Sequence, residues 1–179
     1  MKLIYFLLIT TASIYAQPNV NVLSEDEFES IQINGHSISQ IRSTNGNEIQ
    51  IIDLFGTYNN LKATNLGGVS YEYFFKSLNN GEFKIGFSST NSSSGEVPLS
   101  NFEITDKDIN LSIKGVNFSV GDNISVLSPL NLEKNTAGNY SSRVEAFLIA
   151  PCEGCNNFLY IKYNIHDQSI LEVGYIEMT

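Results

Sequence analysis

The sequence predicts an α+β fold of two tandem repeats, each a short helix packed on a three- to four-stranded antiparallel sheet. Three observations lead to this prediction. Segment 37–55 aligns with segment 112–130 at a constant offset of 75 residues, and Gly46 and Gly121 occupy matching positions. Each segment carries apolar residues at helical spacing. Alternating apolar and polar residues, which are typical of half-buried strands, then follow in the same order in both halves.

The chain of 179 residues divides into four parts. Residues 1–16 combine an early lysine with an apolar run, which is typical of a removable secretory signal. A transmembrane anchor is the alternative, but an anchor needs about 20 apolar residues, and polar residues begin at position 17. Residues 17–36 form an acidic lead-in, residues 37–108 the first repeat and residues 109–179 the second. We therefore expect a mature protein that is secreted or periplasmic.

The composition disfavours several classes of function. The chain has 10 Lys and Arg against 19 Asp and Glu, a net charge of −9. Binding to nucleic acid is disfavoured, because that affinity comes largely from cations that neutralise phosphates. An anionic membrane surface is disfavoured for the same reason. Two cysteines are too few for a disulfide framework or a four-thiolate zinc site. We expect no cofactor and no metal, and a protein as the partner; the oligomeric state stays open.

Each repeat is expected to begin with an extended or irregular segment, which holds Ile38 and Ile41 in the first copy, and to turn sharply at its glycine. A short helix follows in each copy. Its apolar positions recur at three-residue spacing, as Ile49, Ile52 and Phe55 in one copy and Ile124, Leu127 and Leu130 in the other. Gly56 is placed to cap the first helix. Pro129 is expected to end the second helix early.

Three strands complete each repeat. Tyr71, Tyr73 and Phe75 alternate with polar residues and so share one face of a strand. The LNNG segment at 78–81 has the Asn-Gly chemistry of a tight hairpin turn. The corresponding strand segments are 71–75 with 144–148, 83–87 with 159–163, and 101–105 with 174–178.

This pattern resembles one repeat of the beta-lactamase inhibitor protein family, and it is similar to the small outer-membrane assembly lipoproteins that share the same unit. The resemblance covers residues 30–179. It implies two units side by side that present a broad sheet face to a partner protein. The chain lacks the lipid-anchor Cys of the assembly proteins and the Trp residues and two disulfides usual in the inhibitors, so the partner is not implied. The residues that carry the resemblance are Ile38, Ile41, Gly46, Ile52, Leu54, Gly56, Tyr71, Tyr73, Ile85 and Phe87, and more faintly Gly121, Ile124, Leu127, Phe147 and Tyr163.

Tyrosines are the candidate binding residues, because aromatic side chains carry much of the binding energy of interfaces. For each of them, a place in the core of a protein without tryptophan is the alternative. The candidates are Tyr71, Tyr73, Tyr160 and Tyr163, with Tyr58 and Tyr140 as further members of the set.

Cys152 and Cys155, in the segment PCEGCNN, lie between two predicted strands. In an exported protein we interpret them as a small disulfide that closes a hairpin tip. A redox pair, free thiols and half of a metal site are the alternatives. The redox alternative is disfavoured because Glu153, between the thiols, opposes a thiolate.

Other chemistry-bearing residues give weaker signals. His36 and His166 have no metal or triad spacing around them. Asp106 and Asp108 begin a calcium-loop pattern that the following residues do not continue. A weak calcium site near these two aspartates therefore stays open.

The function expected from these features is that of an exported, non-catalytic protein that binds another protein through its sheet face, as an inhibitor or an envelope component. The acidic segment 24–30 could steer a basic partner toward it. The alternative is an exported hydrolase that uses Asp or Glu residues, since 19 acidic residues permit many carboxylate pairs and none is singled out.

Overall fold

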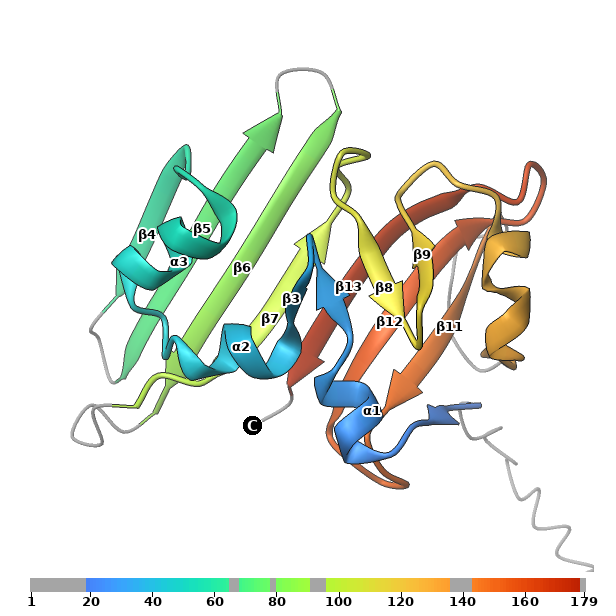
Figure 1. Ribbon diagram of the computed structural model, residues 1–179, viewed down its shortest axis with the longest axis horizontal. Helices are drawn as coiled ribbons and strands as arrows, with labels where there is room; N and C mark the ends of the chain where they lie inside the picture. Colours follow the sequence, from blue (N-terminus) through green and yellow to red (C-terminus); the bar gives the residue numbers. More distant parts are fainter. Residues whose placement is uncertain (1–18, 65–67, 78–79, 91–95, 136–142, 178–179) are drawn as a thin grey trace, which may run out of the picture.

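The computed structural model describes residues 19–64, 68–77, 80–90, 96–135 and 143–177 (Figure 1). The predicted signal segment 1–16, Tyr140 and half of the predicted turn at 78–81 lie outside these ranges. The elements in chain order are β1 (Asn21–Val22), α1 (Glu25–Glu29), β2 (Gln32–Ile33), β3 (His36–Ser37), α2 (Ile38–Ser43), α3 (Glu48–Phe55), β4 (Asn60–Thr64), β5 (Val69–Ser77), β6 (Gly81–Ser89), β7 (Leu99–Ile104), β8 (Leu111–Ile113), β9 (Val116–Phe118), the 3₁₀ helix η1 (Ile124–Leu130), β10 (Lys134–Asn135), β11 (Val144–Ala150), β12 (Asn157–Asn164) and β13 (Ile170–Glu177).

A nine-stranded sheet forms one layer of the fold. Its strand order is β1-β11-β12-β13-β7-β6-β5-β4, and β10 also pairs with β11. All neighbours are antiparallel except β1 and β11. A smaller sheet, of order β3-β2-β8-β9, and the helices lie together on one side of the large sheet (Figure 1). The predicted α+β class is confirmed.

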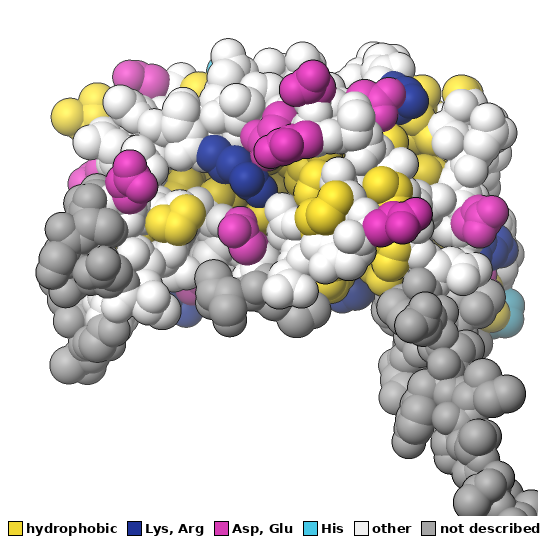
Figure 2. Space-filling view, turned by 90° about the horizontal axis from the view of Figure 1, so that it is seen from below, with side chains coloured by type: hydrophobic (Ala, Val, Ile, Leu, Met, Phe, Trp, Pro, Cys, Tyr) yellow, Lys and Arg dark blue, Asp and Glu magenta, His cyan; other side chains and the backbone are white. Residues whose placement is uncertain are grey.

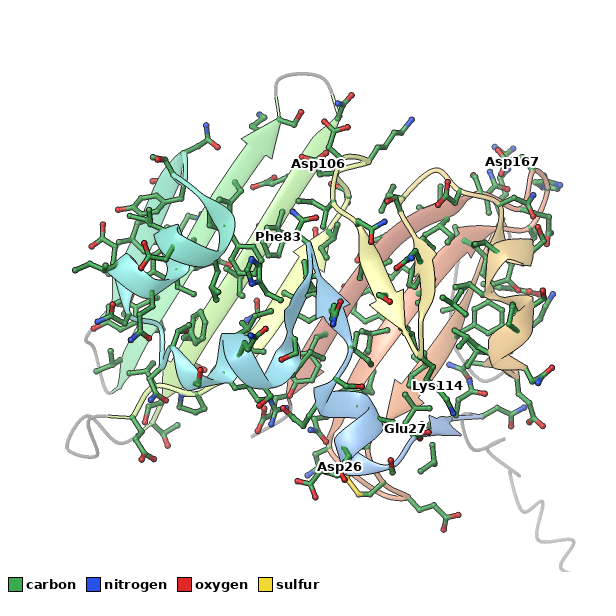
Figure 3. All side chains as sticks on the ribbon, in the orientation of Figure 1. Asp26, Glu27, Phe83, Asp106, Lys114 and Asp167 are labelled. Atoms are coloured by element: carbon green, nitrogen blue, oxygen red, sulfur yellow. A yellow bond between two sulfur atoms is a disulfide. The ribbon has the colours of Figure 1, made fainter. Side chains whose placement is uncertain are left out.

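The core lies between these two layers. We call the covered face of the large sheet the inner face. One row of cross-strand pairs crosses it as Tyr73, Ile85, Phe102, Tyr175, Leu159 and Ile149, and each of these side chains is at most 1% exposed. Phe83 lies in the neighbouring row, between the sheet and the elements in front of it (Figure 3).

The segment with Ile38 and Ile41 forms helix α2, so the prediction of an extended or irregular segment is wrong. Ser37 caps the helix by accepting a hydrogen bond from the Gln40 backbone N–H, and the Gln40 side chain accepts one from the Ser37 N–H. This reciprocal pair satisfies two backbone donors at the start of a helix. Ser-x-x-Gln at 37–40 was therefore the signal for a helix at this position.

The apolar stripe of α3 differs from the predicted one. Ile49 is 71% exposed, whereas Ile51 is fully buried. The helix begins after Asn47, whose side chain caps the Gln50 N–H. Ile51, Leu54 and Phe55 then follow the i, i+3, i+4 spacing of one helix face, which leaves Ile49 on the solvent side. Gly56 ends the helix with φ +82°, as predicted.

The second predicted helix is the 3₁₀ helix η1. A 3₁₀ helix has three residues per turn, so the three-residue spacing of Ile124, Leu127 and Leu130 places all three on one side. Pro129 does not end the helix early, because η1 continues to Leu130. Gly46 and Gly121, ahead of α3 and η1, have φ of +69° and +94° and make the predicted sharp turns.

The acidic lead-in is part of the folded domain rather than a solvated segment. Phe28 of α1 is fully buried, while Glu25 and Asp26 of the same helix are exposed. Glu27 forms an ion pair of 2.8 Å with Lys114 at the tip of the β8–β9 hairpin (Figure 3). This contact links the lead-in to the smaller sheet.

Candidate functional site

We call the side of the large sheet opposite the inner face the outer face. None of the described helices and no strand of the smaller sheet lies on it (Figure 1). Phe74, Lys84 and Glu103 lie in one cross-strand row on this face. All three are partly exposed, whereas the inner-face row beside them is buried. An uncovered sheet face of this kind can receive a partner protein.

Cross-strand lysine and glutamate residues neutralise the outer face. Ion pairs join Lys62 to Glu72 at 3.8 Å, Lys84 to Glu103 at 3.0 Å, and Lys162 to Glu172 at 2.8 Å, and Lys76 lies opposite Glu82 in the β5–β6 register. These four positive and four negative charges cancel. The net charge of −9 therefore belongs to the rest of the chain.

Tyr160 lies flat across Gly174 on the outer face. A Cβ atom added to Gly174 would meet the Tyr160 Cζ and Oη atoms at 2.3 Å. The Tyr160 hydroxyl donates a hydrogen bond of 2.7 Å to Glu172, and the Lys162 Nζ atom is 4.7 Å from the ring centroid. Burial raises the pKa of Tyr160, and the hydrogen bond to Glu172 raises it further. The ring thus covers the sheet instead of projecting from it.

The half of the outer face formed by β1, β11, β12 and β13 carries apolar side chains that are exposed or partly exposed. Ile176 is 39% exposed and pairs across the sheet with the partly exposed Phe158. Val22 of β1 is 47% exposed and pairs with Ala150. We call Val22, Phe158 and Ile176 the apolar patch. Apolar residues of this kind are typical of the buried core of a protein–protein interface, which contains few charged residues.

The four candidate tyrosines do not form one surface. Tyr71 and Tyr73 belong to the inner face of β5, Tyr163 belongs to the inner face of β12, and Tyr160 belongs to the outer face. Tyr73, Tyr163 and Tyr160 are 1%, 0% and 9% exposed, so the expectation of exposed contact residues is wrong for these three. They take the alternative place, in the core or against the sheet. Tyr71 alone among the four is partly exposed.

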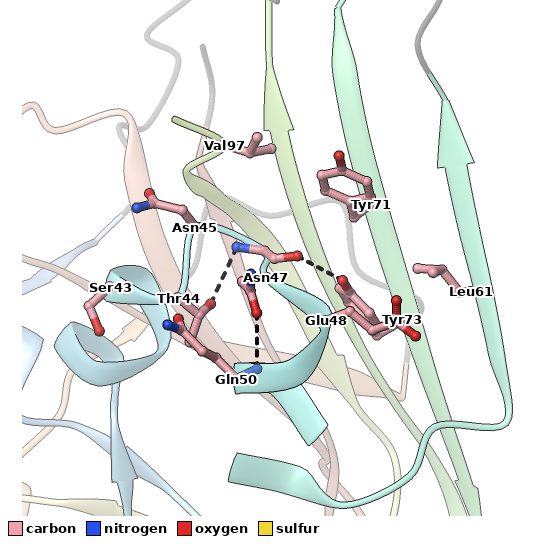
Figure 4. Close-up of a pocket in the computed structure, with 11 residues that line it drawn as sticks. Ser43, Thr44, Asn45, Asn47, Glu48, Gln50, Leu61, Tyr71, Tyr73 and Val97 are labelled. Carbon is pink, nitrogen blue, oxygen red and sulfur yellow. Dashed lines mark hydrogen bonds between the residues drawn. The ribbon is translucent and has the colours of Figure 1, made fainter. Parts of the chain in front are cut away.

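A pocket of about 480 Å³ opens at the turn between α2 and α3 (Figure 4). We call it the α2–α3 pocket. Gly46 is one of its lining residues: its N–H donates to the Thr44 hydroxyl at 3.3 Å and its carbonyl accepts from the Tyr73 hydroxyl at 2.7 Å. Burial raises the pKa of Tyr73 to about 12. The pocket is lined by Ser43, Thr44, Asn45, Gly46, Asn47, Glu48, Gln50, Leu61, Tyr71, Tyr73 and Val97.

Cys152 and Cys155 are joined as a disulfide in the loop between β11 and β12, with their Cα atoms 5.4 Å apart. This loop and α1 lie at the lower edge of Figure 1. The space-filling view of that edge shows acidic side chains close to a basic group (Figure 2). Close to α1 and this loop, the Arg42 guanidinium lies 3.2 Å from Glu29 and donates a hydrogen bond of 2.6 Å to the Tyr175 hydroxyl. A small cleft beside it is lined by both cysteines.

Burial raises the pKa of the Glu29 carboxyl group above its ordinary value. The guanidinium of Arg42 opposes this shift. A general acid for hydrolysis needs a raised pKa in a site that receives substrate. Glu29 lines the small cleft but is paired with Arg42 at 3.2 Å, which explains it as part of a structural ion pair.

The remaining candidates have structural surroundings. The His36 ring packs edge-on against Phe55, with 5.7 Å between ring centroids. Asp106 is buried and accepts the Asp108 N–H at 2.9 Å, which closes a turn. In the described ranges no group of three or more His, Cys, Asp or Glu side chains is arranged to hold a metal ion. None of the helices in these ranges has the length and apolar character that a membrane crossing requires.

Comparison with known proteins identifies no relative: no family model, no curated protein and no solved structure matches the chain.

Proposed function

We propose that this chain is an exported, non-catalytic protein that binds another protein through the outer face of its large sheet. The observation that carries the proposal is the uncovered outer face, on the other side of the sheet from an inner face that the helices and the smaller sheet cover over most of its width. An antiparallel sheet can leave one face to solvent. The residues on a solvent-facing sheet face are usually polar or charged. Part of the outer face instead consists of the apolar patch.

We infer that the sheet is built from two copies of one unit. Strands β4 to β7 form one antiparallel series and β10 to β13 another, and the two series meet where β7 pairs with β13. The hairpins β2–β3 and β8–β9, which precede the helices of the two halves, also meet side by side. Both hairpins turn at a glycine with positive φ, Gly35 and Gly115. On this inference the first unit begins at β2, ahead of residue 37.

The partner that fits the outer face is a folded protein with a neutral, partly apolar surface. The lysines and glutamates of the outer face are already paired with each other. A basic partner would gain from the acidic remainder of the surface but would have to compete with these pairs. We therefore expect little dependence of the affinity on salt, because screening acts on unpaired charges.

Export is part of the same proposal. It rests on the apolar segment 1–16, which is typical of a secretory signal. The disulfide between Cys152 and Cys155 fits an oxidising compartment. We place the mature protein, from residue 17 onward, outside the cytoplasm, either secreted or periplasmic.

Site-specific photo-crosslinking tests the docking face. A crosslinking residue is placed at Ile176 in the apolar patch or, as the matched control, at Ile49 on the opposite side of the molecule, which is also an exposed isoleucine. We expect one protein of the native envelope extract to crosslink at 176 and not at 49. With that protein purified, Ile176→Asp should weaken binding about tenfold or more, and Ile49→Asp should not.

Three results would overturn the proposal: crosslinking at 49 as strong as at 176, binding that Ile176→Asp leaves unchanged, or binding that disappears at high salt. Circular dichroism and thermal unfolding of both variants show whether the fold is kept. Hydrolysis of a polymer substrate by the purified chain, lost on removal of one carboxylate, would establish the hydrolase alternative instead.

A further inference from the structure

We propose that the α2–α3 pocket binds a neutral saccharide. The pocket lies on the inner-face side of β5, so it is separate from the outer face and the inference does not depend on the proposed protein docking. Its volume of about 480 Å³ is within the range of small-molecule sites. The chemistry of its lining decides which class of small molecule fits.

An aromatic ring forms one wall of the pocket. Tyr71 is partly exposed, although Tyr73 and Phe87 next to it on the same face are at most 1% exposed. The absence of a side chain at Gly46 lets the Tyr71 ring approach the turn, since a Cβ atom there would lie 3.2 Å from Tyr71 Cδ2. The C–H face of a sugar ring stacks on such an exposed aromatic face.

Three carboxamide side chains, those of Asn45, Asn47 and Gln50, also line the pocket, across from Tyr71 (Figure 4). Asn47 Oδ1 caps the Gln50 N–H at 3.2 Å, which leaves the Asn47 amide group as a donor. The side chains of Asn45 and Gln50 are exposed and form no hydrogen bond to another described residue. A carboxamide presents donors and an acceptor together. This matches sugar hydroxyl groups, each of which both donates and accepts.

The charge of the lining selects against other ligands. Glu48 is the one acidic residue among the lining residues, and none of them is Lys or Arg. Phosphates and acidic sugars would meet a negative charge without a cation to pair with. Fully apolar ligands would leave the amide groups without partners on burial. A neutral saccharide satisfies the amides, can donate a hydroxyl to Glu48 and covers the Tyr71 ring.

The test uses the mature chain, residues 17 to the end, on an array of neutral and acidic oligosaccharides, followed by NMR titration with the best neutral oligosaccharide. Tyr71→Ala should weaken binding about tenfold by loss of the stacking surface, and Tyr71→Phe should restore most of it. Gln50→Ala should weaken binding roughly three- to tenfold by loss of hydrogen bonds. Gln32→Ala, an exposed glutamine on β2, is the matched control and should bind as the wild type does.

The proposal is overturned if the array shows no neutral saccharide bound, if acidic saccharides are preferred, or if Gln50→Ala and Tyr71→Ala bind as well as Gln32→Ala. Gln50 is exposed, so its replacement keeps the test valid if Tyr71→Ala does not fold. Ile176→Asp should leave saccharide binding unchanged, which separates this outcome from that of the docking experiment.

Discussion

Replacement of Gly174 by alanine should force Tyr160 away from the outer face. The new methyl group would lie 2.3 Å from Tyr160 Cζ and Oη, more than 1 Å short of the 3.4 Å at which ordinary contact begins. The backbone at Gly174 has ordinary strand geometry, so the ring and not the strand must move. Tyr160 would then lose its hydrogen bond of 2.7 Å to Glu172.

The expected cost is about 2 kcal/mol in the free energy of unfolding. Overpacking at a filled site costs roughly 1–3 kcal/mol, and a hydrogen bond to a charged group contributes about 1.5–3 kcal/mol when it is buried. Alanine in a strand offsets about 0.5–1 kcal/mol of this relative to glycine. The hydrogen bond counts for less than its full value here, because Glu172 remains 20% exposed.

A double-mutant cycle measured by urea unfolding tests this reasoning. In a Tyr160→Ala background, where the clashing ring is absent, Gly174→Ala should cost close to nothing, which gives a coupling energy of about 2 kcal/mol. An equal cost in both backgrounds would show that Tyr160 does not lie on Gly174.

Tyrosine titration by ultraviolet absorbance gives an independent readout. Burial holds the pKa of Tyr160 above its ordinary value of 10, so its contribution to stability is present below pH 10 and is lost as the pH rises above 10. In Gly174→Ala this pKa should fall toward 10, and one more tyrosine should ionise in that range than in the wild type.

Three further predictions concern stability. Arg42→Met should cost about 1–2 kcal/mol at pH 7, since Arg42 and Glu29 are 31% and 25% exposed. Burial already raises the pKa of Glu29, and without Arg42 this pKa should rise further. The variant should therefore lose stability as the pH increases from about 4.5 to 7. If urea titrations show a loss that does not depend on pH, the ion pair is not the cause. Reduction of the disulfide should cost no more than about 2 kcal/mol, because the loop that it closes is very short; a thermal unfolding scan with and without reductant measures this, and global unfolding on reduction would contradict it. Gly46→Ala should destabilise more than Gly35→Ala, by about 1 kcal/mol or more, because both glycines have positive φ but an added Cβ meets Phe87 and Tyr71 at 3.1–3.2 Å at Gly46 alone; equal melting temperatures would refute the packing argument.

Local signals in the sequence predicted much of the fold. Alternation in 71–75 and 83–87 predicted the β5–β6 hairpin, in which Tyr73 pairs with Ile85. Glycines at 46 and 121 predicted turns that need positive φ. Such features depend on a few neighbouring residues, so the sequence contains them directly. Helix α2 is equally local, because Ser37 and Gln40 form the capping pair at its start.

The sequence predicted less of the candidate site than of the fold. Tyr160 and Tyr163 are three residues apart in one strand, and a period of two places them on opposite faces. That spacing already excluded a common surface for both. The α2–α3 pocket joins residues 43–50 with β4, β5 and Val97, and only the folded chain brings these segments together.

The sequence by itself determined the long strands β5, β6, β7, β11, β12 and β13, the turns at Gly46 and Gly121, and the acidic character of the protein, because these depend on local backbone preferences and composition. The tertiary structure decided which face of each element is buried. Ile49 is exposed and Ile51 is buried because helix α3 packs on the sheet from one direction. The outer face is neutral because strand register places each of its lysines beside a glutamate, and register is set by pairing between distant segments.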